Sequence, residues 1–201
     1  MELNFELPIG DICDVSRIEN NQQRLVDSMI DTQIQSKKWL VQELYTLYPD
    51  LQNFFIIGSW YGNILFPYLV NNFNVNSIYA YDIDSDAARY STRFSKRIHD
   101  NINVSIKNPY SEISAIKQMN KFDNSIMINT SSEHMPNMIN LRVNDKPYLM
   151  AVQSNNFYDE EDHFNCCDNV EQLINKCGIT TIDYAGELHF EKYKRFMVIG
   201  K

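Results

Sequence analysis

Short apolar runs alternate with helix-like segments along most of this chain of 201 residues. The first run, residues 54–57, is Phe-Phe-Ile-Ile and stops at Gly58, which is typical of a central strand buried on both faces of a sheet. Strand-like runs follow at residues 77–81, 104–106, 125–129 and 148–153, and helical patterns at residues 63–71, 85–98, 111–119, 133–141 and 169–176. Strands that alternate with helices pair in parallel through right-handed crossovers. The sequence therefore predicts an α/β fold around a parallel sheet.

The end of the chain follows another pattern. Residues 180–184 and 196–199 are both strand-like, and no helical segment separates them, so we expect an antiparallel pair. With this pair the prediction is a Rossmann-like three-layer sandwich, in which a mostly parallel seven-stranded sheet carries a C-terminal antiparallel hairpin. A length of 201 residues suits one domain with a full hydrophobic core, so residues 1–201 are predicted to form a single domain.

The segment before the first strand has a pattern of its own. Residues 1–20 show weak periodicity and contain Pro8 and Gly10, which predicts an irregular lead-in. From residue 21 to residue 48 apolar side chains recur at helical spacing, which indicates one or two amphipathic helices that end at Pro49. We expect residues 1–48 to be a helical lead-in that can cap the substrate or cofactor site.

Composition narrows the class of protein. Apolar residues make up 44% and charged residues 22%, as in ordinary globular proteins. No apolar run approaches the roughly 18 residues that a membrane span needs. Residues 1–8 lack the basic cluster of a signal peptide, so we expect a cytoplasmic protein without a membrane partner. The four cysteines show no CxxC spacing and are interpreted as buried or incidental thiols, with no metal site predicted.

The charge of the chain bears on its partners. A net charge of −8 argues against binding of nucleic acid through a broad basic face, so no strong electrostatic footprint for nucleic acid is expected. Residues 192–195 form a short basic stretch near the C-terminus. We interpret residues 193–195 as a solvated strand end, with contact to an anionic acceptor as the alternative.

Two features lie where an open parallel sheet binds its ligands, beyond the carboxyl ends of the strands. The turn from Gly58 to Gly62 joins a strand to a helix, and its glycines allow backbone N–H groups to approach a ligand closely. Asp82 ends the second strand, 24 positions after Gly58, where a carboxylate can accept both hydroxyls of a ribose. The alternatives are a plain turn covered by Trp60, and an Asp82 or Asp84 that caps the next helix.

A polar loop follows the fifth strand at the same edge. Residues 153–158 and 162–165 are rich in amides and aromatic rings and include His163, a set that suits a small polar acceptor or the edge of a nucleobase. The alternative is a hydrated surface loop. The residues predicted to bind substrate are Glu133, Gln153, Asn155, Asn156, Tyr158 and His163.

The first 150 residues resemble the class I S-adenosylmethionine-dependent methyltransferase superfamily. The resemblance rests on the turn from Gly58 to Gly62, on Asp82, and on residues 129–135, in which a Glu-His pair opens a short helix. The sequence departs from the family at Ile56, where an acidic residue is usual, and at Trp60, which replaces the middle glycine. These departures leave room for a use of the cofactor other than methyl transfer.

The resemblance implies that S-adenosylmethionine is the cofactor, with its methionine part on the glycine turn, its ribose on Asp82 and its adenine near Asn108. The implied cofactor-binding residues are Gly58, Ser59, Trp60, Gly62, Asp82, Ile83, Asn108, Asn129 and Thr130. Methyl transfer requires alignment of the acceptor and removal of a proton. We predict His134 as the base, because an imidazole titrates near neutral pH. The alternative is that His134 caps or packs the short helix.

The predicted function is therefore S-adenosylmethionine-dependent methyl transfer to a small molecule or an exposed base. Two alternatives stay open: another reaction of the same cofactor, such as aminocarboxypropyl transfer or cofactor cleavage, and a non-catalytic Rossmann-like binding module. A nicotinamide dehydrogenase is disfavoured, because the third glycine is missing and the chain ends in a hairpin.

Overall fold

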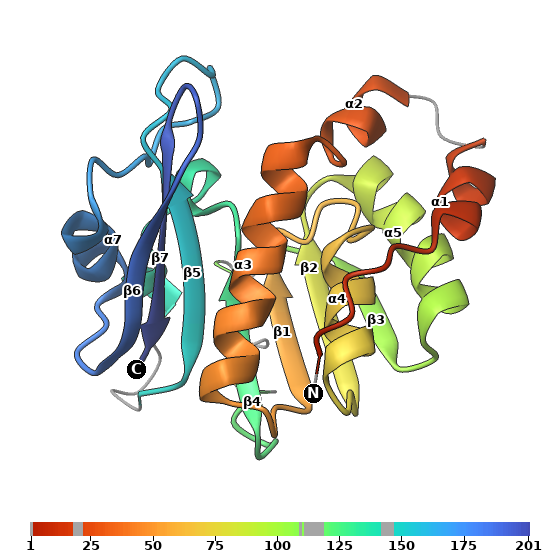
Figure 1. Cartoon of the computed structure of the whole chain (residues 1–201), viewed down its shortest axis with the longest axis horizontal. Coiled ribbons are helices and arrows are strands. Elements are labelled where there is room, and N and C mark those ends of the chain that lie inside the picture. Colours follow the sequence, from red (N-terminus) through yellow and green to blue (C-terminus); the bar gives the residue numbers. More distant parts are fainter. Residues whose placement is uncertain (1, 18–21, 109, 111–118, 142–146) are drawn as a thin grey trace.

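The computed structural model describes residues 2–17, 22–108, 110, 119–141 and 147–201. All seven described strands lie in one sheet, in the order β3-β2-β1-β4-β5-β7-β6 (Figure 1). The strands are β1 (Asn53–Ile57), β2 (Ser77–Asp82), β3 (Ile102–Ile106), β4 (Ser125–Asn129), β5 (Met150–Asn155), β6 (Ile182–His189) and β7 (Lys194–Gly200).

The pairing of the strands confirms the predicted fold class. Strands β1 to β5 pair in parallel, and β7 pairs with both β5 and β6 in the antiparallel sense. The fifth strand is shifted relative to the prediction: it begins at Met150 and ends at Asn155, so Gln153 lies inside the sheet and the loop begins later. The third strand begins at Ile102, two residues earlier than predicted.

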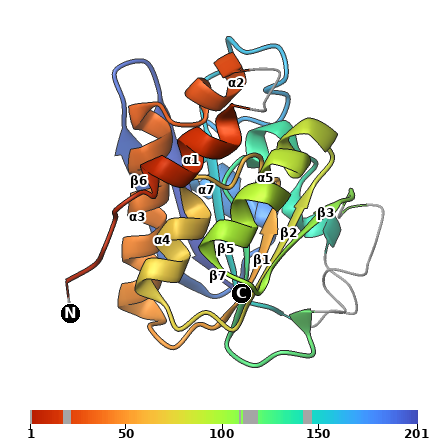
Figure 2. The same cartoon turned by 90° about the vertical axis from the view of Figure 1, so that its right-hand side faces the viewer.

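Helices cover both faces of the sheet (Figures 1 and 2). One face packs against α1 (Ile9–Ser16), α3 (Asp31–Leu47), α4 (Leu65–Asn72) and α5 (Ser85–Ile98), and the other against α7 (Val170–Cys177). Strand β1 shows why the run of residues 54–57 is apolar throughout. Phe54 and Ile56 join the first core, whereas Phe55 and Ile57 join the second, since side chains alternate along a strand.

The prediction of an irregular lead-in is wrong for residues 9–16, which form α1. Ile12 and Val15 of this helix are buried, and α1 contacts α5. Arg97 of α5 also bonds Asp11 at 3.0 Å and Asp14 at 3.3 Å. Packing on α5 therefore stabilises a helix that its own periodicity predicts weakly. The prediction of one or two further helices is confirmed by α2 (Gln22–Asp27) and α3.

The segment after β4 also differs from the prediction. Two 3₁₀ turns, η1 (Ser132–His134) and η2 (Met138–Leu141), replace the short helix expected over residues 133–141, although its interruption at Pro136 was expected. Pro136 separates them, and Met135 before it is extended, because a proline disfavours helical geometry at the preceding residue. Except for Met119, the helix predicted over residues 111–119 lies outside the described residues. Among the helices that the structure describes, none is both long and apolar enough to cross a bilayer.

Candidate functional site

The carboxyl ends of β2, β1, β4 and β5 are neighbours at one edge of the sheet (Figure 1). The turn after β1 is bound directly to the end of β2: the N–H groups of Gly58 and Ser59 donate to the carbonyl of Tyr81 at 2.9 and 3.2 Å. The loops after these four strands therefore meet, as the sequence predicts for a ligand site in this type of sheet.

The carboxylate of Asp82 faces the glycine turn. Its Oδ2 accepts a hydrogen bond from the N–H of Trp60 at 2.6 Å, and its Oδ1 accepts one from the N–H of Asp84 at 2.9 Å. Asp82 is only 8% exposed, and burial raises its pKa, although these backbone N–H groups act in the opposite direction. The carboxylate thus holds Trp60, whose φ of 48° is a left-handed conformation that side chains rarely adopt.

The two glycines of the turn are closely covered by protein side chains. A Cβ on Gly58 would lie 2.0 Å from Cε of Met135, and a Cβ on Gly62 would lie 2.3 Å from Cε2 of Phe66. Both glycines have positive φ, 66° and 67°. Met135 thus lies over Gly58, whereas Gly62 allows α4 to pack against the turn. Trp60 is half-buried beside Tyr61, with ring centroids 5.3 Å apart.

The capping alternative applies to Asp84 rather than to Asp82. The Oδ1 of Asp84 accepts hydrogen bonds from the N–H groups of Asp86 and Ala87 at the start of α5. Arg24 of α2 pairs with the other oxygen of Asp84. Burial alone would raise the pKa of Asp84, but the bonds from Arg24 and from the helix hold it below its ordinary value. The N-terminal segment therefore reaches this rim, beside an Ile83 that is 73% exposed.

The remaining residues predicted to bind cofactor have different surroundings. Asn108 is exposed, and its Oδ1 accepts the N–H of Tyr110 at 3.0 Å. Asn129 is buried, and its Oδ1 accepts the N–H of Ser131 at 2.9 Å. Thr130 is also buried, and its carbonyl accepts Nη1 of Arg195 at 2.8 Å. Asn129 and Thr130 therefore shape the loop after β4.

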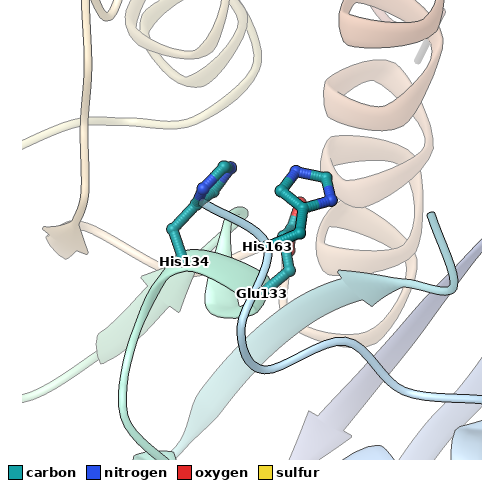
Figure 3. A group of neighbouring side chains, drawn as sticks. All are labelled: Glu133, His134 and His163. Carbon is teal, nitrogen blue, oxygen red and sulfur yellow. The ribbon is translucent and has the colours of Figure 1, made fainter. Parts of the chain in front are cut away.

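Glu133, His134 and His163 come together from two loops (Figure 3). Glu133 and His134 lie in η1 after β4, and His163 lies in the loop after β5. The two imidazole rings meet edge to face, with centroids 4.5 Å apart. Nδ1 of His134 lies 3.1 Å from Oδ2 of Asp162, and Nδ1 of His163 lies 2.5 Å from the carbonyl of Phe157. The structure thus brings the predicted base close to two of the residues predicted to bind substrate.

The Glu133 carboxylate is fixed on one side only. Its Oε1 accepts Nδ2 of Asn155 at 2.7 Å and lies 3.3 Å from Nη2 of Arg195. Its Oε2 is buried and has no hydrogen-bond partner among the described residues. Glu133 and Arg195 are 2% and 3% exposed, so this ion pair is shielded from solvent.

The other residues predicted to bind substrate lie apart from Glu133, His134 and His163 and bond other parts of the chain. Gln153 is fully buried, and its Nε2 donates to the carbonyl of Ser36 in α3 at 2.9 Å. Asn156 joins the loop to β7, since its Oδ1 accepts the N–H of Lys194 at 2.7 Å. Tyr158 is 55% exposed and donates to Asp168 at 2.5 Å. Of the predicted substrate residues, Glu133, Asn155 and His163 are therefore the ones that converge.

Two basic residues at the site were not predicted from the sequence. The interpretation of residues 193–195 as a solvated strand end is wrong for Arg195, which is buried opposite Asn155 in the β5–β7 pair. Lys37 of α3 is near the same charges. Its pKa is lowered to about 7 by burial and by Arg195, and Glu133 opposes this change. The position of Arg195 beside Asn155 follows from the register of β7 against β5. The local sequence does not specify that register.

Comparison with known proteins supports the fold. No family model and no curated protein matches the chain. Among solved structures, a SAM-dependent methyltransferase from Aquifex aeolicus has a TM-score of 0.56 at 15% identity, over 94% of this chain and 96% of that one. TrmK of M. capricolum, in complex with S-adenosyl-homocysteine, has a TM-score of 0.56 at 14% identity, over 81% of this chain and 68% of that one. A variant of MtNAS in complex with S-adenosylmethionine has a TM-score of 0.56 at 11% identity, over 96% of this chain and 71% of that one. The chain has the fold of class I S-adenosylmethionine-dependent methyltransferases.

Proposed function

We propose that the chain binds S-adenosylmethionine at the edge formed by β1, β2 and β4 and transfers its methyl group to a small molecule or an exposed base. The observation that carries the proposal is the position of Asp82, which ends β2 with its carboxylate turned toward the glycine turn after β1. Two structures that share the fold but little sequence, a variant of MtNAS and TrmK, were crystallised with S-adenosylmethionine and with S-adenosyl-homocysteine.

The carboxylate of Asp82 retains capacity for a ligand. The backbone N–H groups of Trp60, Asp84 and Ile83 bond the carboxylate, and each carboxylate oxygen offers about two acceptor positions. The remaining acceptor capacity suits the cofactor ribose. Gly58, Ser59, Trp60 and Gly62 then face the methionine part, while Ile83 and Asn108 flank the adenine.

The residues of the chain have two tasks in this reaction, because the cofactor supplies the methyl group. One is to align the acceptor, for which Asn155 and Glu133 are fixed by mutual hydrogen bonding. The other is to take a proton from the acceptor. His134 suits this task, since Asp162 at its Nδ1 orients the ring and leaves Nε2 as the proton acceptor.

A second reaction of the same cofactor is favoured by a specific observation. Trp60 stands in the turn with positive φ, where the family has a glycine, and changes the surface that meets the methionine part. MtNAS, which shares the fold, has been crystallised with MTA. Aminocarboxypropyl transfer or cleavage of the cofactor would release methylthioadenosine, whereas methyl transfer would release S-adenosylhomocysteine.

Calorimetry with S-adenosylmethionine and S-adenosylhomocysteine tests the proposal first. We expect both to bind to the purified chain, with one site per chain. Incubation with cofactor labelled in the methyl group, together with pooled metabolites or nucleic acid, then identifies the product. Label found in an acceptor supports methyl transfer, and labelled methylthioadenosine supports the second reaction. If neither S-adenosylmethionine nor S-adenosylhomocysteine binds, a non-catalytic module is favoured and both proposed reactions are refuted.

A further inference from the structure

We infer that Glu133, His134 and His163 form a binding site for one divalent transition-metal ion, beside the position proposed for the acceptor. Each residue offers one ligand atom, and the three atoms lie within 4.8 Å of one another (Figure 3). The sequence analysis predicted no metal site because the cysteines lack CxxC spacing, and it did not connect the two histidines, which are 29 positions apart. The bearing of this ion on catalysis depends on the proposed function, but its binding does not.

The neighbours of Nδ1 in the two imidazoles are those expected of metal ligands. A histidine that binds a metal through one ring nitrogen usually donates its other N–H to a carboxylate or a backbone carbonyl. Nδ1 of His163 faces the carbonyl of Phe157, which only accepts, so this nitrogen carries the proton. Nδ1 of His134 lies 3.1 Å from Oδ2 of Asp162, and this carboxylate attracts a proton to that nitrogen. Both rings are therefore left with a lone pair on Nε2.

The carboxylate of Glu133 gives independent support. Its Oε1 is occupied by Asn155 and Arg195, whereas its Oε2 is buried without a partner among the residues that the structure describes. A buried carboxylate oxygen without a partner is costly, because it loses its water and gains nothing in return. A cation bound to Oε2 removes that cost.

The charges around the site are compatible with a cation. Arg195 lies beside Glu133, and its side chain is already bonded to the carbonyl of Thr130 and to Oε1 of Glu133. Lys37 adds little repulsion, since its pKa of about 7 leaves it partly neutral at physiological pH. Asp162 contributes a second negative charge behind His134.

The donor set selects the class of metal. Two imidazoles and one carboxylate suit Zn²⁺, Co²⁺, Mn²⁺ or Fe²⁺, whereas Mg²⁺ and Ca²⁺ prefer oxygen ligands alone. Cys166 is close to Asn155, but burial raises the pKa of its thiol to about 11, so it stays protonated and is a poor ligand. Three protein ligands leave at least one position open for water or an acceptor atom, as in catalytic zinc sites.

Binding requires a small contraction of the site. With bonds of about 2.0–2.1 Å, two ligands of a tetrahedral zinc lie about 3.3 Å apart. The longest of the present separations therefore shortens by about 1.5 Å. His163 lies in the connection between β5 and α7 and is half-buried, so this loop is the part that adjusts.

The metal site changes the part that His134 plays. A single lone pair on Nε2 either accepts a proton or binds a metal ion, so the two uses exclude one another. In the metal-loaded protein His134 would be a ligand of the ion, and the ion would supply the Lewis acid that polarises an acceptor. A methyltransferase that uses the ion would lose activity with a chelator, whereas one that uses His134 as a base would not.

The test is titration of the full chain, stripped with EDTA, with Zn²⁺, Mn²⁺ and Co²⁺ and without cofactor. We expect one ion per chain by calorimetry, and for Co²⁺ a visible spectrum without a thiolate charge-transfer band. His134→Ala and His163→Ala should each weaken binding at least tenfold. The matched control is His189→Ala, since His189 also pairs with a carboxylate, that of Glu187 at 2.7 Å, on an exposed hairpin. This variant should bind as the unmodified chain does.

Several outcomes would overturn the inference: no saturable binding, unchanged binding in both site variants, equal loss in the control, or a cobalt–thiolate band. Thermal unfolding of the metal-free variants establishes that they are folded. Asp162→Asn provides a second variant that keeps all three ligands, and a smaller loss of affinity is expected from it because it removes only the partner of His134. Since no cofactor is present, failure of S-adenosylmethionine binding leaves this result unaffected.

Discussion

The carboxylate of Asp82 and the backbone N–H of Trp60 lie 2.6 Å apart, so the end of β2 holds the turn after β1 in place. Trp60 has a left-handed backbone at φ 48°, which for a residue with a Cβ costs about 1–2 kcal/mol. A short hydrogen bond to a buried carboxylate helps to offset that cost. Asp82 therefore has a structural role even before any ligand is bound.

The first prediction follows from these two roles of Asp82. Asp82→Ala should weaken S-adenosylmethionine binding by about 1–3 kcal/mol, the range for hydrogen bonds to a charged group. It should also lower the free energy of unfolding, because the N–H groups of Trp60 and Asp84 lose their acceptor. Calorimetry and urea unfolding measure the two effects. Asp86→Ala is the matched control, since Asp86 is a half-exposed residue of α5 that pairs with Arg89. Unchanged affinity in Asp82→Ala would remove Asp82 from the site.

The arrangement of the sheet was predictable because its signals are local. Residues 54–57 are apolar at every position since β1 is buried on both faces, and the missing helix before β7 indicated the hairpin. The place of Asp82 beside the glycine turn followed from the rule that parallel strands end at one edge. Helix α1 was not predictable in this way, because its stability depends on contacts with α5.

Local sequence patterns did not predict the contacts among Glu133, His134, Asn155, His163 and Arg195. The pairing of Asn155 with Arg195 depends on the register between β5 and β7, which are separated by about 40 residues. The meeting of His134 with His163 depends on the course of the loop after β5. Neither signal lies in spacing along the chain, so Arg195 was interpreted as solvated and no metal site was predicted.

The second prediction concerns the close contact between Gly58 and Met135. Gly58→Ala should lower the free energy of unfolding by about 1–2 kcal/mol from its positive φ alone, and by more from the clash with Cε of Met135. Met135→Ala in the same chain should remove the clash and leave only the cost of the backbone conformation. Urea unfolding of both single variants and the double variant measures this coupling. Strictly additive effects would show that Met135 does not lie over Gly58.

The third prediction concerns pH and Lys37. Burial lowers the pKa of Lys37 in the folded chain from 10.5 to about 7, so between these values the unfolded chain binds more protons. The contribution of Lys37 therefore makes stability rise with pH across this window, and its cost is fully present below about pH 7. Lys37→Met should stabilise the protein at pH 6–7 and flatten this rise. Unfolding in urea at several pH values measures the stabilisation and the change in pH dependence, and Lys96→Met, at an exposed position, is the control. Parallel curves of unfolding free energy against pH for Lys37→Met and the unmodified chain would contradict the prediction.

The fourth prediction separates the ion pair of Glu133 and Arg195 from the proposed metal site. Arg195→Met leaves the Glu133 carboxylate buried without its cation and should lower the free energy of unfolding by about 3–5 kcal/mol. Glu133→Gln leaves Arg195 unpaired and should have a similar effect. The double variant should cost less than the sum, because neither charge is then left alone.

Metal ions should act differently on these two variants. Arg195→Met keeps Glu133, His134 and His163, so Zn²⁺ should restore part of its lost stability by binding to the folded chain. Glu133→Gln has lost one ligand, so the same Zn²⁺ concentration should restore much less. Thermal unfolding with and without the ion measures the difference. Equal recovery of both variants would mean that the ion binds elsewhere, because only Glu133 supplies a ligand that one variant has and the other lacks.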